Sequence, residues 1–259
     1  MILDEIAGYA RERVRGLKRL KSLEIVREEA EARPAGKNFY EALAKPGLSV
    51  IAELKKASPS KGLIAPEFEK IYLQRAAAYE LGGAAAISCL TEPKFFLGSD
   101  QYLSNVRKVV SIPILRKDFT VDEYQIYEAK NIGADAVLLI CSILSEVQLK
   151  EYLDLARSLG LSALVEAHTA EETGMALNAG ARIIGVNNRN LKDFSVNPLN
   201  SLRLRDNIPK DRIFVAESGI QKVADVFGLK KAGVNAVLIG EALMRTNNPA
   251  AMIGEILGE

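Results

Sequence analysis

The sequence predicts an α/β protein built as a single (β/α)8 TIM barrel. Three observations support this prediction. Eight short apolar runs of strand length, bounded by turn residues, recur after Leu48. Segments with helical periodicity lie between these runs, and several of them end at glycine. The runs are almost continuously apolar, which is typical of parallel strands that are covered by helices on both faces of a sheet.

The expected elements follow one another as strand, helix, strand, helix. The strands are residues 49–56, 84–92, 113–119, 135–142, 162–168, 182–188, 212–218 and 236–242, and the helices are residues 67–81, 121–131, 145–159, 169–178 and 221–232. Eight such units in about 210 residues, without a linker rich in proline, glycine or serine, favour a closed barrel. An open nucleotide-binding sheet is disfavoured, because ASPSKG after the first strand matches neither G-x-G-x-x-G nor a P-loop.

The first 48 residues stand outside the repeat. An apolar stripe at helical spacing, formed by Leu3, Ile6, Ala10, Val14 and Leu17, predicts a helix that packs on the barrel. We therefore expect one domain over residues 1–259, of which 1–48 is an N-terminal helical extension. The basic run RERVRGLKRLK raises the hypothesis of an RNA or phosphate contact, but a solvated helix face is the preferred interpretation.

Composition excludes several classes of function. Lys plus Arg number 34 against 33 for Asp plus Glu, a net charge of +1, so no global field would draw the protein onto nucleic acid or an anionic membrane. The two cysteines, Cys89 and Cys141, are predicted to be buried reduced thiols. No apolar stretch approaches the ~18 residues of a membrane span, and the start of the chain mixes acidic and basic residues, which predicts a cytoplasmic protein.

Polar residues gather where the predicted strands end. Seven of the eight runs finish on such groups, namely Glu53, Lys55, Thr91, Glu92, Lys117, Asp118, Glu166, Asn187, Asn188, Glu217, Ser218 and Glu241. In a barrel the carboxyl ends of the strands form the active-site mouth, so a polar pocket is expected there. Because residues two apart share a face of a strand, two lysines and three carboxylates can converge. The alternative is that these residues form salt bridges that support the rim.

Glycines follow the last two strands, in VAESG and LIGE. Loops at this place in barrels commonly hold phosphate on backbone N–H groups, so Gly219 and Gly240 predict a site for an anionic, phosphorylated small substrate. A plain turn function for the two glycines remains the alternative.

Metal and nucleophile sites have weak signals. The single histidine, His168, has no His or Cys partner at ligand spacing, and Thr169 with Glu172 predicts a helix capping box, so His168 is interpreted as the end of a strand. No nucleophile elbow is present. The remaining chemistry is acid–base catalysis by Lys and Glu, for which we expect neither cofactor nor metal.

Taken together, the motifs resemble those of the indole-3-glycerol phosphate synthase family over nearly the whole chain. The matching segments are IAELKKASPSKG (51–62), LTEPKFFLGS (90–99), PILRKDF (113–119), LVE (164–166), GVNNRNL (185–191), VAESGI (215–220) and LIGEALMR (238–245). This family of tryptophan biosynthesis converts 1-(2-carboxyphenylamino)-1-deoxyribulose 5-phosphate into indole-3-glycerol phosphate by ring closure, decarboxylation and dehydration. The resemblance therefore implies a carboxy-lyase.

The resemblance also implies roles for individual residues. Lys117 would be the leading general acid, Lys55 would bind the substrate carboxylate or share the acid role, and Glu166 would act in the dehydration. Glu53 and Asn187 would orient these groups, and Glu217 would bind substrate. The phosphate would rest on Ser58, Ser218, Gly219, Gly240 and the backbone of Glu241. Phe96 and Phe119 would wall the anthranilate ring, Arg189 and Leu191 would line the mouth, and the N-terminal helix would cover it.

One position departs from some members of the family, which have Ser where this chain has Glu241. Because a carboxylate would repel phosphate, we expect that the Glu241 amide contacts the ligand and the side chain turns away. Phosphoribosylanthranilate isomerase or another sugar-phosphate barrel, and a non-catalytic sugar-phosphate-binding barrel, are the alternatives. Association with other enzymes of the tryptophan pathway is left open.

Overall fold

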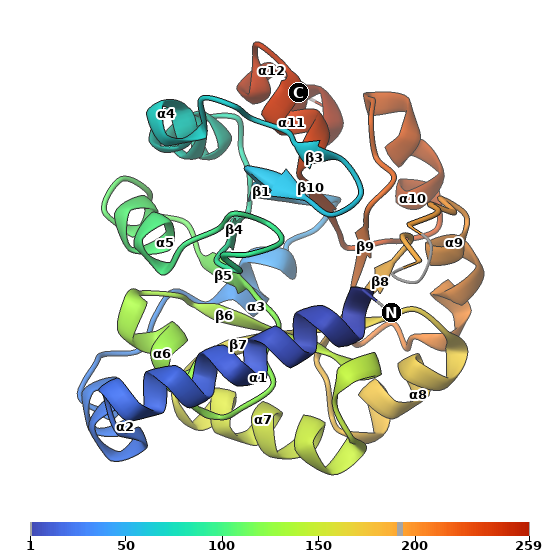
Figure 1. Ribbon diagram of the computed structural model, residues 1–259. Coiled ribbons are helices and arrows are strands. Elements are labelled where there is room, and N and C mark those ends of the chain that lie inside the picture. Colours follow the sequence, from blue (N-terminus) through green and yellow to red (C-terminus); the bar gives the residue numbers. More distant parts are fainter. Residues whose placement is uncertain (1, 191–193, 259) are drawn as a thin grey trace.

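The computed structural model describes residues 2–190 and 194–258 and contains a closed barrel of parallel strands (Figure 1). The strands are β1 (Ser49–Leu54), β4 (Ala86–Leu90), β5 (Ile114–Lys117), β6 (Ala136–Ile140), β7 (Ser162–Ala167), β8 (Ile183–Asn187), β9 (Ile213–Glu217) and β10 (Ala236–Ile239). Each strand pairs with its neighbours in chain order, and β10 pairs with β1 to close the ring. The predicted (β/α)8 fold and all eight predicted strands are confirmed.

Helices cover the outside of the barrel. They are α4 (Phe68–Leu81), α5 (Asp100–Arg107), α6 (Tyr124–Ile132), α7 (Glu146–Ser158), α8 (Ala170–Asn178), α9 (Asn200–Leu204), α10 (Phe227–Lys231), α11 (Glu241–Arg245) and α12 (Pro249–Leu257), with short 3₁₀ turns η1 (Cys141–Ile143), η2 (Arg205–Asn207) and η3 (Val223–Val226). The helix predicted over residues 221–232 is therefore wrong in part, because a 3₁₀ turn precedes a short α10. A helix was expected after each strand, but no bounds were predicted for α5, α9, α11 and α12.

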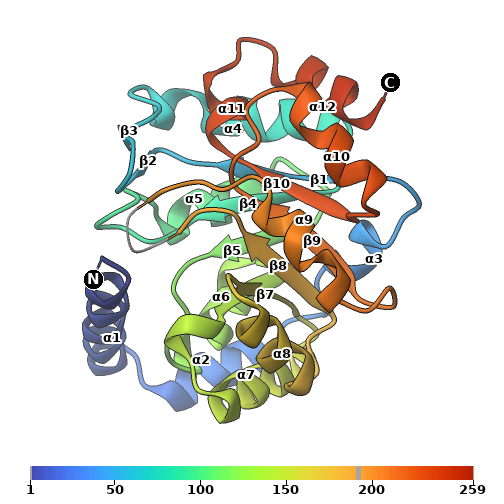
Figure 2. The same ribbon diagram turned by 90° about the vertical axis from the view of Figure 1, so that its right-hand side faces the viewer.

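The segment before β1 is helical, as predicted. It comprises α1 (Ile2–Leu20), α2 (Leu23–Glu31) and α3 (Phe39–Leu43). The apolar stripe of α1 faces the barrel, with Ile6, Ala10 and Val14 buried. In Figures 1 and 2, α1 crosses the end of the barrel at which the strands finish.

The basic run on α1 is only partly a solvated face. Arg11, Arg15 and Arg19 are exposed, as expected. By contrast, an Arg13 Nη2 donates to Asp118 Oδ2 at 2.6 Å and Lys18 Nζ donates to Asp122 Oδ2 at 2.8 Å. The preferred interpretation was thus wrong for Arg13 and Lys18, because the loop that follows β5 presents carboxylates to them.

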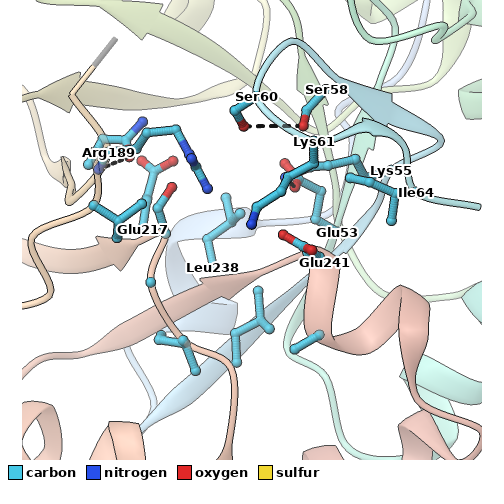
Figure 3. Close-up of a pocket in the computed structure, with 18 of the residues that line it drawn as sticks. Glu53, Lys55, Ser58, Ser60, Lys61, Ile64, Arg189, Glu217, Leu238 and Glu241 are labelled. Carbon is cyan, nitrogen blue, oxygen red and sulfur yellow. Dashed lines mark hydrogen bonds and ion pairs between the residues drawn. The ribbon is translucent and has the colours of Figure 1, made fainter. Parts of the chain in front are cut away.

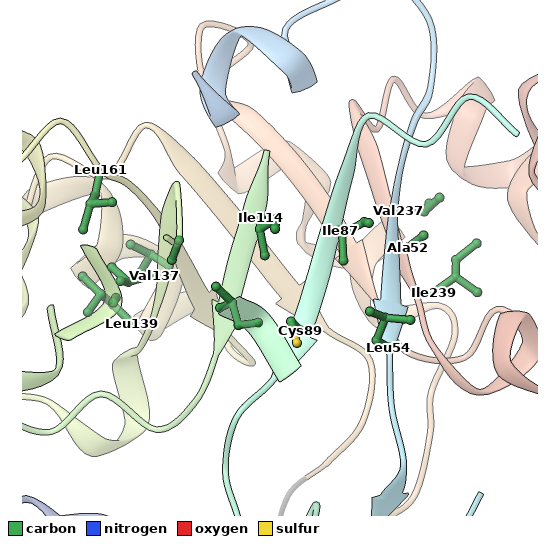
Figure 4. Packing of buried hydrophobic residues seen from close by; sticks show 14 of the residues in the cluster. Ala52, Leu54, Ile87, Cys89, Ile114, Val137, Leu139, Leu161, Val237 and Ile239 are labelled. Atoms are coloured by element: carbon green, nitrogen blue, oxygen red, sulfur yellow. The ribbon is translucent and has the colours of Figure 1, made fainter. Parts of the chain in front are cut away.

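Two apolar layers explain why the strand sequences read as continuous apolar runs. Alternate residues of β1, such as Ala52 and Leu54, point outward and pack under the helices together with Ile87 and Cys89 (Figure 4). Ile51 points into the barrel, where it packs in a second cluster with Leu115, Leu138, Leu164, Val215 and Leu238. Glu53, two residues after Ile51, therefore shares the inward face at the strand's end. Cys89 and Cys141 are free and buried, as predicted.

The loop after β1 carries a small hairpin that the sequence did not predict. Its strands β2 (Ala57–Ser58) and β3 (Gly62–Leu63) pair antiparallel across the ASPSKG segment.

None of the helices in the described ranges is long and apolar enough to cross a membrane.

Candidate active site

A cavity of about 1470 Å³ opens at the carboxyl ends of the barrel strands. Fourteen of the fifteen candidate site residues line it: Glu53, Lys55, Ser58, Phe96, Lys117, Phe119, Glu166, Asn187, Arg189, Glu217, Ser218, Gly219, Gly240 and Glu241. The fifteenth, Leu191, lies outside the described residues. Ile2, Leu3 and Ile6 of α1 also line the cavity. Figure 3 shows side chains from β1, β9 and the hairpin loop pointing into this space.

Lys117 lies at the end of β5 between two buried carboxyl groups. Its Nζ is 3.3 Å from Glu166 Oε2 and 3.5 Å from Glu217 Oε2. Burial alone would lower the pKa of this lysine, but Glu166, Glu217 and Glu53 together raise the pKa above its usual value. The ammonium form is therefore stabilised inside the cavity.

The two carboxyl groups beside Lys117 have opposite pKa shifts. Burial favours the protonated form of Glu166, but Lys117, His168 and a hydrogen bond from Asn187 Nδ2 at 3.2 Å outweigh it and lower the pKa. For Glu217, burial and the neighbouring Glu166 and Glu53 outweigh Lys117 and raise the pKa to about 8. Since like charges cannot both be stable so close together, Glu166 is the ionised member and Glu217 the protonated member at neutral pH.

A second lysine–carboxylate pair lies at the end of β1, where Lys55 Nζ contacts Glu53 Oε2. Space for this pair depends on Gly240, because a Cβ at that position would collide with Oε2 of Glu53. Gly185 likewise leaves space for the Glu217 side chain, since a Cβ at position 185 would collide with Glu217 Oε1. Both glycines thus permit buried acidic side chains to occupy the barrel interior.

The loops after β9 and β10 and the hairpin loop surround one side of the cavity. Ser218 has φ of 66° and Gly219 has φ of 87°, both in the left-handed region, which is uncommon for serine. Ser58 Oγ and Ser60 Oγ lie 3.4 Å apart on the hairpin (Figure 3). The Glu241 carboxylate accepts a hydrogen bond from Nε of Arg245 at 3.0 Å.

Two phenylalanines face each other across another part of the cavity. The ring centroids of Phe96 and Phe119 are 6.0 Å apart, with the rings tilted by 36°. The loop bearing Phe96 is held by Glu92, which is fully buried and accepts hydrogen bonds from the backbone N–H groups of Phe95 and Phe96 at 2.6 and 2.9 Å. Glu92 thus supports the rim through backbone hydrogen bonds rather than through the salt bridge that the alternative proposed.

The remaining strand-end residues also contact one another. Thr91 Oγ1 donates to Oδ2 of Asp118, the residue after Lys117, at 2.9 Å. The Asn188 Nδ2 group donates to the Ser218 carbonyl at 3.0 Å and supports the loop after β9. Arg189 donates its backbone N–H to Asn187 Oδ1 at 3.0 Å and an Nη1 hydrogen to the Phe194 carbonyl at 3.1 Å.

His168 is the residue whose surroundings sequence reasoning missed. It follows β7, as expected, but its Nε2 is 3.5 Å from Glu166 Oε1 and its Nδ1 is 3.2 Å from Glu172 Oε2. The predicted capping box forms only in part. Thr169 Oγ1 accepts from the Glu172 N–H, whereas the Glu172 carboxylate accepts from the N–H of His168 rather than from that of Thr169. The i, i+4 spacing of His168 and Glu172 was the available signal.

Comparison with known proteins adds independent findings. The family model described as indole-3-glycerol phosphate synthase matches residues 3–256. A curated protein of that name from Ruminiclostridium cellulolyticum is 54% identical over 260 residues, covering 100% of this chain and 99% of the relative. One from Endomicrobium trichonymphae is 53% identical over 258 residues, covering 99% of each chain.

Solved structures support the fold alone. The chain resembles 3-hexulose-6-phosphate synthase from Salmonella typhimurium with a TM-score of 0.65 and 14% identity, covering 82% of this chain and 97% of that one. It resembles thiamine phosphate pyrophosphorylase from Pyrococcus furiosus with a TM-score of 0.61 and 16% identity, covering 85% and 96%.

Proposed function

Since the chain belongs to the indole-3-glycerol phosphate synthase family, a family of carboxy-lyases, we propose that Lys117 and Glu166 perform its acid–base chemistry. The observation that carries this proposal is the ammonium group of Lys117 placed between Glu166 and Glu217 at the mouth of the barrel. The family assignment favours this function over an isomerase or a non-catalytic barrel.

The first step is ring closure. Lys117 donates a proton to the ketone oxygen while the ring carbon that bears the carboxylate attacks the ketone carbon. The raised pKa of Lys117 keeps its proton in place until negative charge develops on that oxygen, which stabilises the transition state. The contact with Glu53 holds the Lys55 side chain in place. From this position Lys55 pairs with the substrate carboxylate or shares the role of general acid.

The later steps remove CO2 and then water. Loss of CO2 restores the aromatic ring, and the hydroxyl formed from the ketone then leaves as water while a proton is lost from the new five-membered ring. Glu166 is ionised and suited to take that proton, with Asn187 and Glu53 orienting it and the substrate. Glu217 lines the cavity, so its carboxyl group can bind a substrate hydroxyl.

The rest of the cavity binds the two ends of the substrate. The phosphate rests on Ser58, Ser218, Gly219, Gly240 and the backbone N–H of Glu241, while the Glu241 carboxylate stays paired with Arg245. Phe96 and Phe119 contact the anthranilate ring, and Arg189 lines the entrance. The substrate is thus a phosphorylated small molecule whose charged groups are bound at opposite sides of the mouth.

Lys117→Ala tests the proposal most directly. We expect a fall in kcat of about 100-fold or more, typical of a lost general acid, with a much smaller change in KM. Indole fluorescence reports the product without background, because the chain has no tryptophan. Full turnover in Lys117→Ala would transfer the acid role to Lys55, and full turnover in Glu166→Gln would remove Glu166 from the mechanism.

We further propose that the reaction needs neither cofactor nor metal. Turnover in the presence of EDTA is then expected to equal turnover in its absence, and a loss that Mg²⁺ or Zn²⁺ restores would contradict this.

The chain is also proposed to act in the cytoplasm, as one domain over residues 1–259 in which residues 1–48 extend the barrel. Reduced, buried Cys89 and Cys141 support that location.

A further inference from the structure

The histidine beside Glu166 occupies a position that the proposed chemistry does not use. Its Nε2 is buried, makes no hydrogen bond to the described part of the chain, and lies 3.5 Å from Glu166 Oε1. His168 is absent from the described residues that line the cavity, so its ring stands behind the cavity wall and does not meet substrate.

The other ring nitrogen of His168, Nδ1, is held by Glu172 at the start of α8. Glu172 Oε2 lies 3.2 Å from Nδ1 and also accepts the His168 backbone N–H at 2.6 Å. A carboxylate accepts hydrogen bonds, so Nδ1 carries a proton. Nε2 then presents either a lone pair or a second N–H to Glu166, and a negatively charged oxygen favours the N–H.

The two oxygens of Glu166 therefore have different neighbours. Oε1 faces His168 Nε2 and accepts from Asn187 Nδ2 at 3.2 Å, while Oε2 faces Lys117. The ring is held between carboxylates from β7 and α8. The Glu217 carboxyl of β9 also faces it, but that group is protonated at neutral pH and adds no charge there. Lys117 stands on the far side of Glu166. A cation at His168 thus completes the set of groups that define where the Glu166 carboxylate points.

We propose that His168 is a positioning residue that acts from behind the cavity wall. Its ring is held by Glu172, is charged as an imidazolium, and fixes the position of Glu166 Oε1. The proposal rests on the proposed catalytic role of Glu166. Burial opposes the charged ring, but the carboxylates of Glu172 and Glu166 outweigh it and raise the pKa of His168. The imidazolium thus persists to higher pH than in an exposed histidine, for which the pKa is about 6.5.

The first test is a ¹⁵N NMR titration of the ring in the untagged, ligand-free protein. Because the chain has one histidine, its imidazole resonances need no assignment. We expect a midpoint above about 6.5 that falls in Glu172→Gln and in Glu166→Gln. Glu171→Gln is the matched control, since it removes the same charge from an exposed neighbour on α8 and should leave the midpoint unchanged. A midpoint that is equal in all four proteins would overturn the proposal.

The second test compares kcat and KM of His168→Ala with those of the wild type across pH. Since misplacement by ~1 Å can cost ~100-fold, we expect partial loss of orientation to lower kcat by about 10-fold with KM within about 2-fold. The ratio of the wild-type kcat to the His168→Ala kcat should shrink as pH rises through the NMR midpoint, because the wild-type ring then loses its positive charge. His168→Gln can donate an N–H at any pH, so it should recover part of the activity without that pH dependence.

The two tests separate this inference from the proposed function. If Glu166→Gln is inactive while His168→Ala equals the wild type at every pH, the positioning role is wrong and the catalytic role of Glu166 stands. If Glu166→Gln turns over normally, the catalytic assignment fails, although the NMR midpoints still report whether the ring is charged. A pH-independent loss in His168→Ala that Gln does not recover would assign the histidine a packing role and contradict the proposal.

Discussion

At the scale of single residues, identical side chains at the mouth differ in charge state because their neighbours differ. Glu166 has Lys117, His168 and Asn187 close to its oxygens, whereas Glu217 shares Lys117 with it and has an oxygen without a hydrogen-bond partner among the described residues. Such a split between two carboxyl groups is a general route to separate acid and base functions in one site. The chemistry is therefore encoded in contacts between strands rather than in any one motif.

Gly240→Ala tests how tightly the site is built. The new Cβ would collide with Glu53 Oε2 and approach Lys55 Nζ to 3.0 Å, so we expect the pair to be displaced and kcat/KM to fall by about 100-fold. Gly254→Ala is the matched control, because nothing lies within 4 Å of its Cβ on helix α12. That control should keep full activity and gain up to about 1 kcal/mol in unfolding free energy. Equal activities of the two variants in the fluorescence assay would contradict this account.

Residue identities in the candidate site were predictable where strand alternation applies. Glu53 follows Ile51 on one face, and the ends of parallel strands meet at one rim, so Lys117, Glu166 and Glu217 were expected together. The space that Gly185 and Gly240 leave was not predictable, since it depends on which side chain of a neighbouring strand crosses the barrel. His168 was missed for the same reason, because its ring contacts depend on how α8 packs against β7.

At the scale of elements, the long periodic segments were predicted and the short ones were not. Helix α4 (Phe68–Leu81) has fourteen residues and was expected nearly in full, whereas α9 (Asn200–Leu204) has five and forms through its neighbours. The hairpin of β2 and β3 is also too short for its sequence to show a period of two. Tertiary contacts, rather than local propensity, decide such elements.

Helix α1 offers a prediction about how an extra element is attached. Arg13 makes one of two ion pairs in the described residues between α1 and the loop after Lys117, and it pairs with Asp118, which is buried, whereas Lys18 pairs with Asp122. In Arg13→Ala the Asp118 carboxylate keeps Arg116 at 3.6 Å, Thr91 Oγ1 and the backbone N–H of Phe119, so we expect a loss of about 1–2 kcal/mol in unfolding free energy.

Arg15→Ala is the control for this variant, since Arg15 is exposed on the same helix and should change stability by less than about 0.5 kcal/mol. Urea unfolding of both variants followed by circular dichroism measures the difference. Equal midpoints would show that α1 is held on the barrel without Arg13, by the apolar stripe with Ile6, Ala10 and Val14 and by the Lys18–Asp122 pair.

At the scale of the whole molecule, the barrel carries buried acidic groups at one end that oppose folding. Glu53, Glu166 and Glu217 are each 2% exposed, so their carboxyl groups are removed from water with only Lys55 and Lys117 as paired lysines among the described residues. Active sites commonly retain such destabilising groups because function requires them. The apolar layers inside and outside the strands supply the stability that tolerates this arrangement.

Glu217→Gln measures that opposition to folding through its pH dependence. Folding raises the pKa of Glu217 from 4.5 to about 8, so between these values the folded protein holds a proton that the unfolded chain has released. Wild-type stability from this group is full below pH 4.5 and is lost as pH rises through 8. Glutamine cannot titrate, so the stability of Glu217→Gln relative to wild type should rise by on the order of 3 kcal/mol between pH 5 and pH 8.5. Urea unfolding at the two pH values measures this difference, and the variant should lose turnover even where it is more stable. A pH-independent difference would show that Glu217 stays ionised beside Lys117 and would contradict the protonated form of Glu217 at neutral pH.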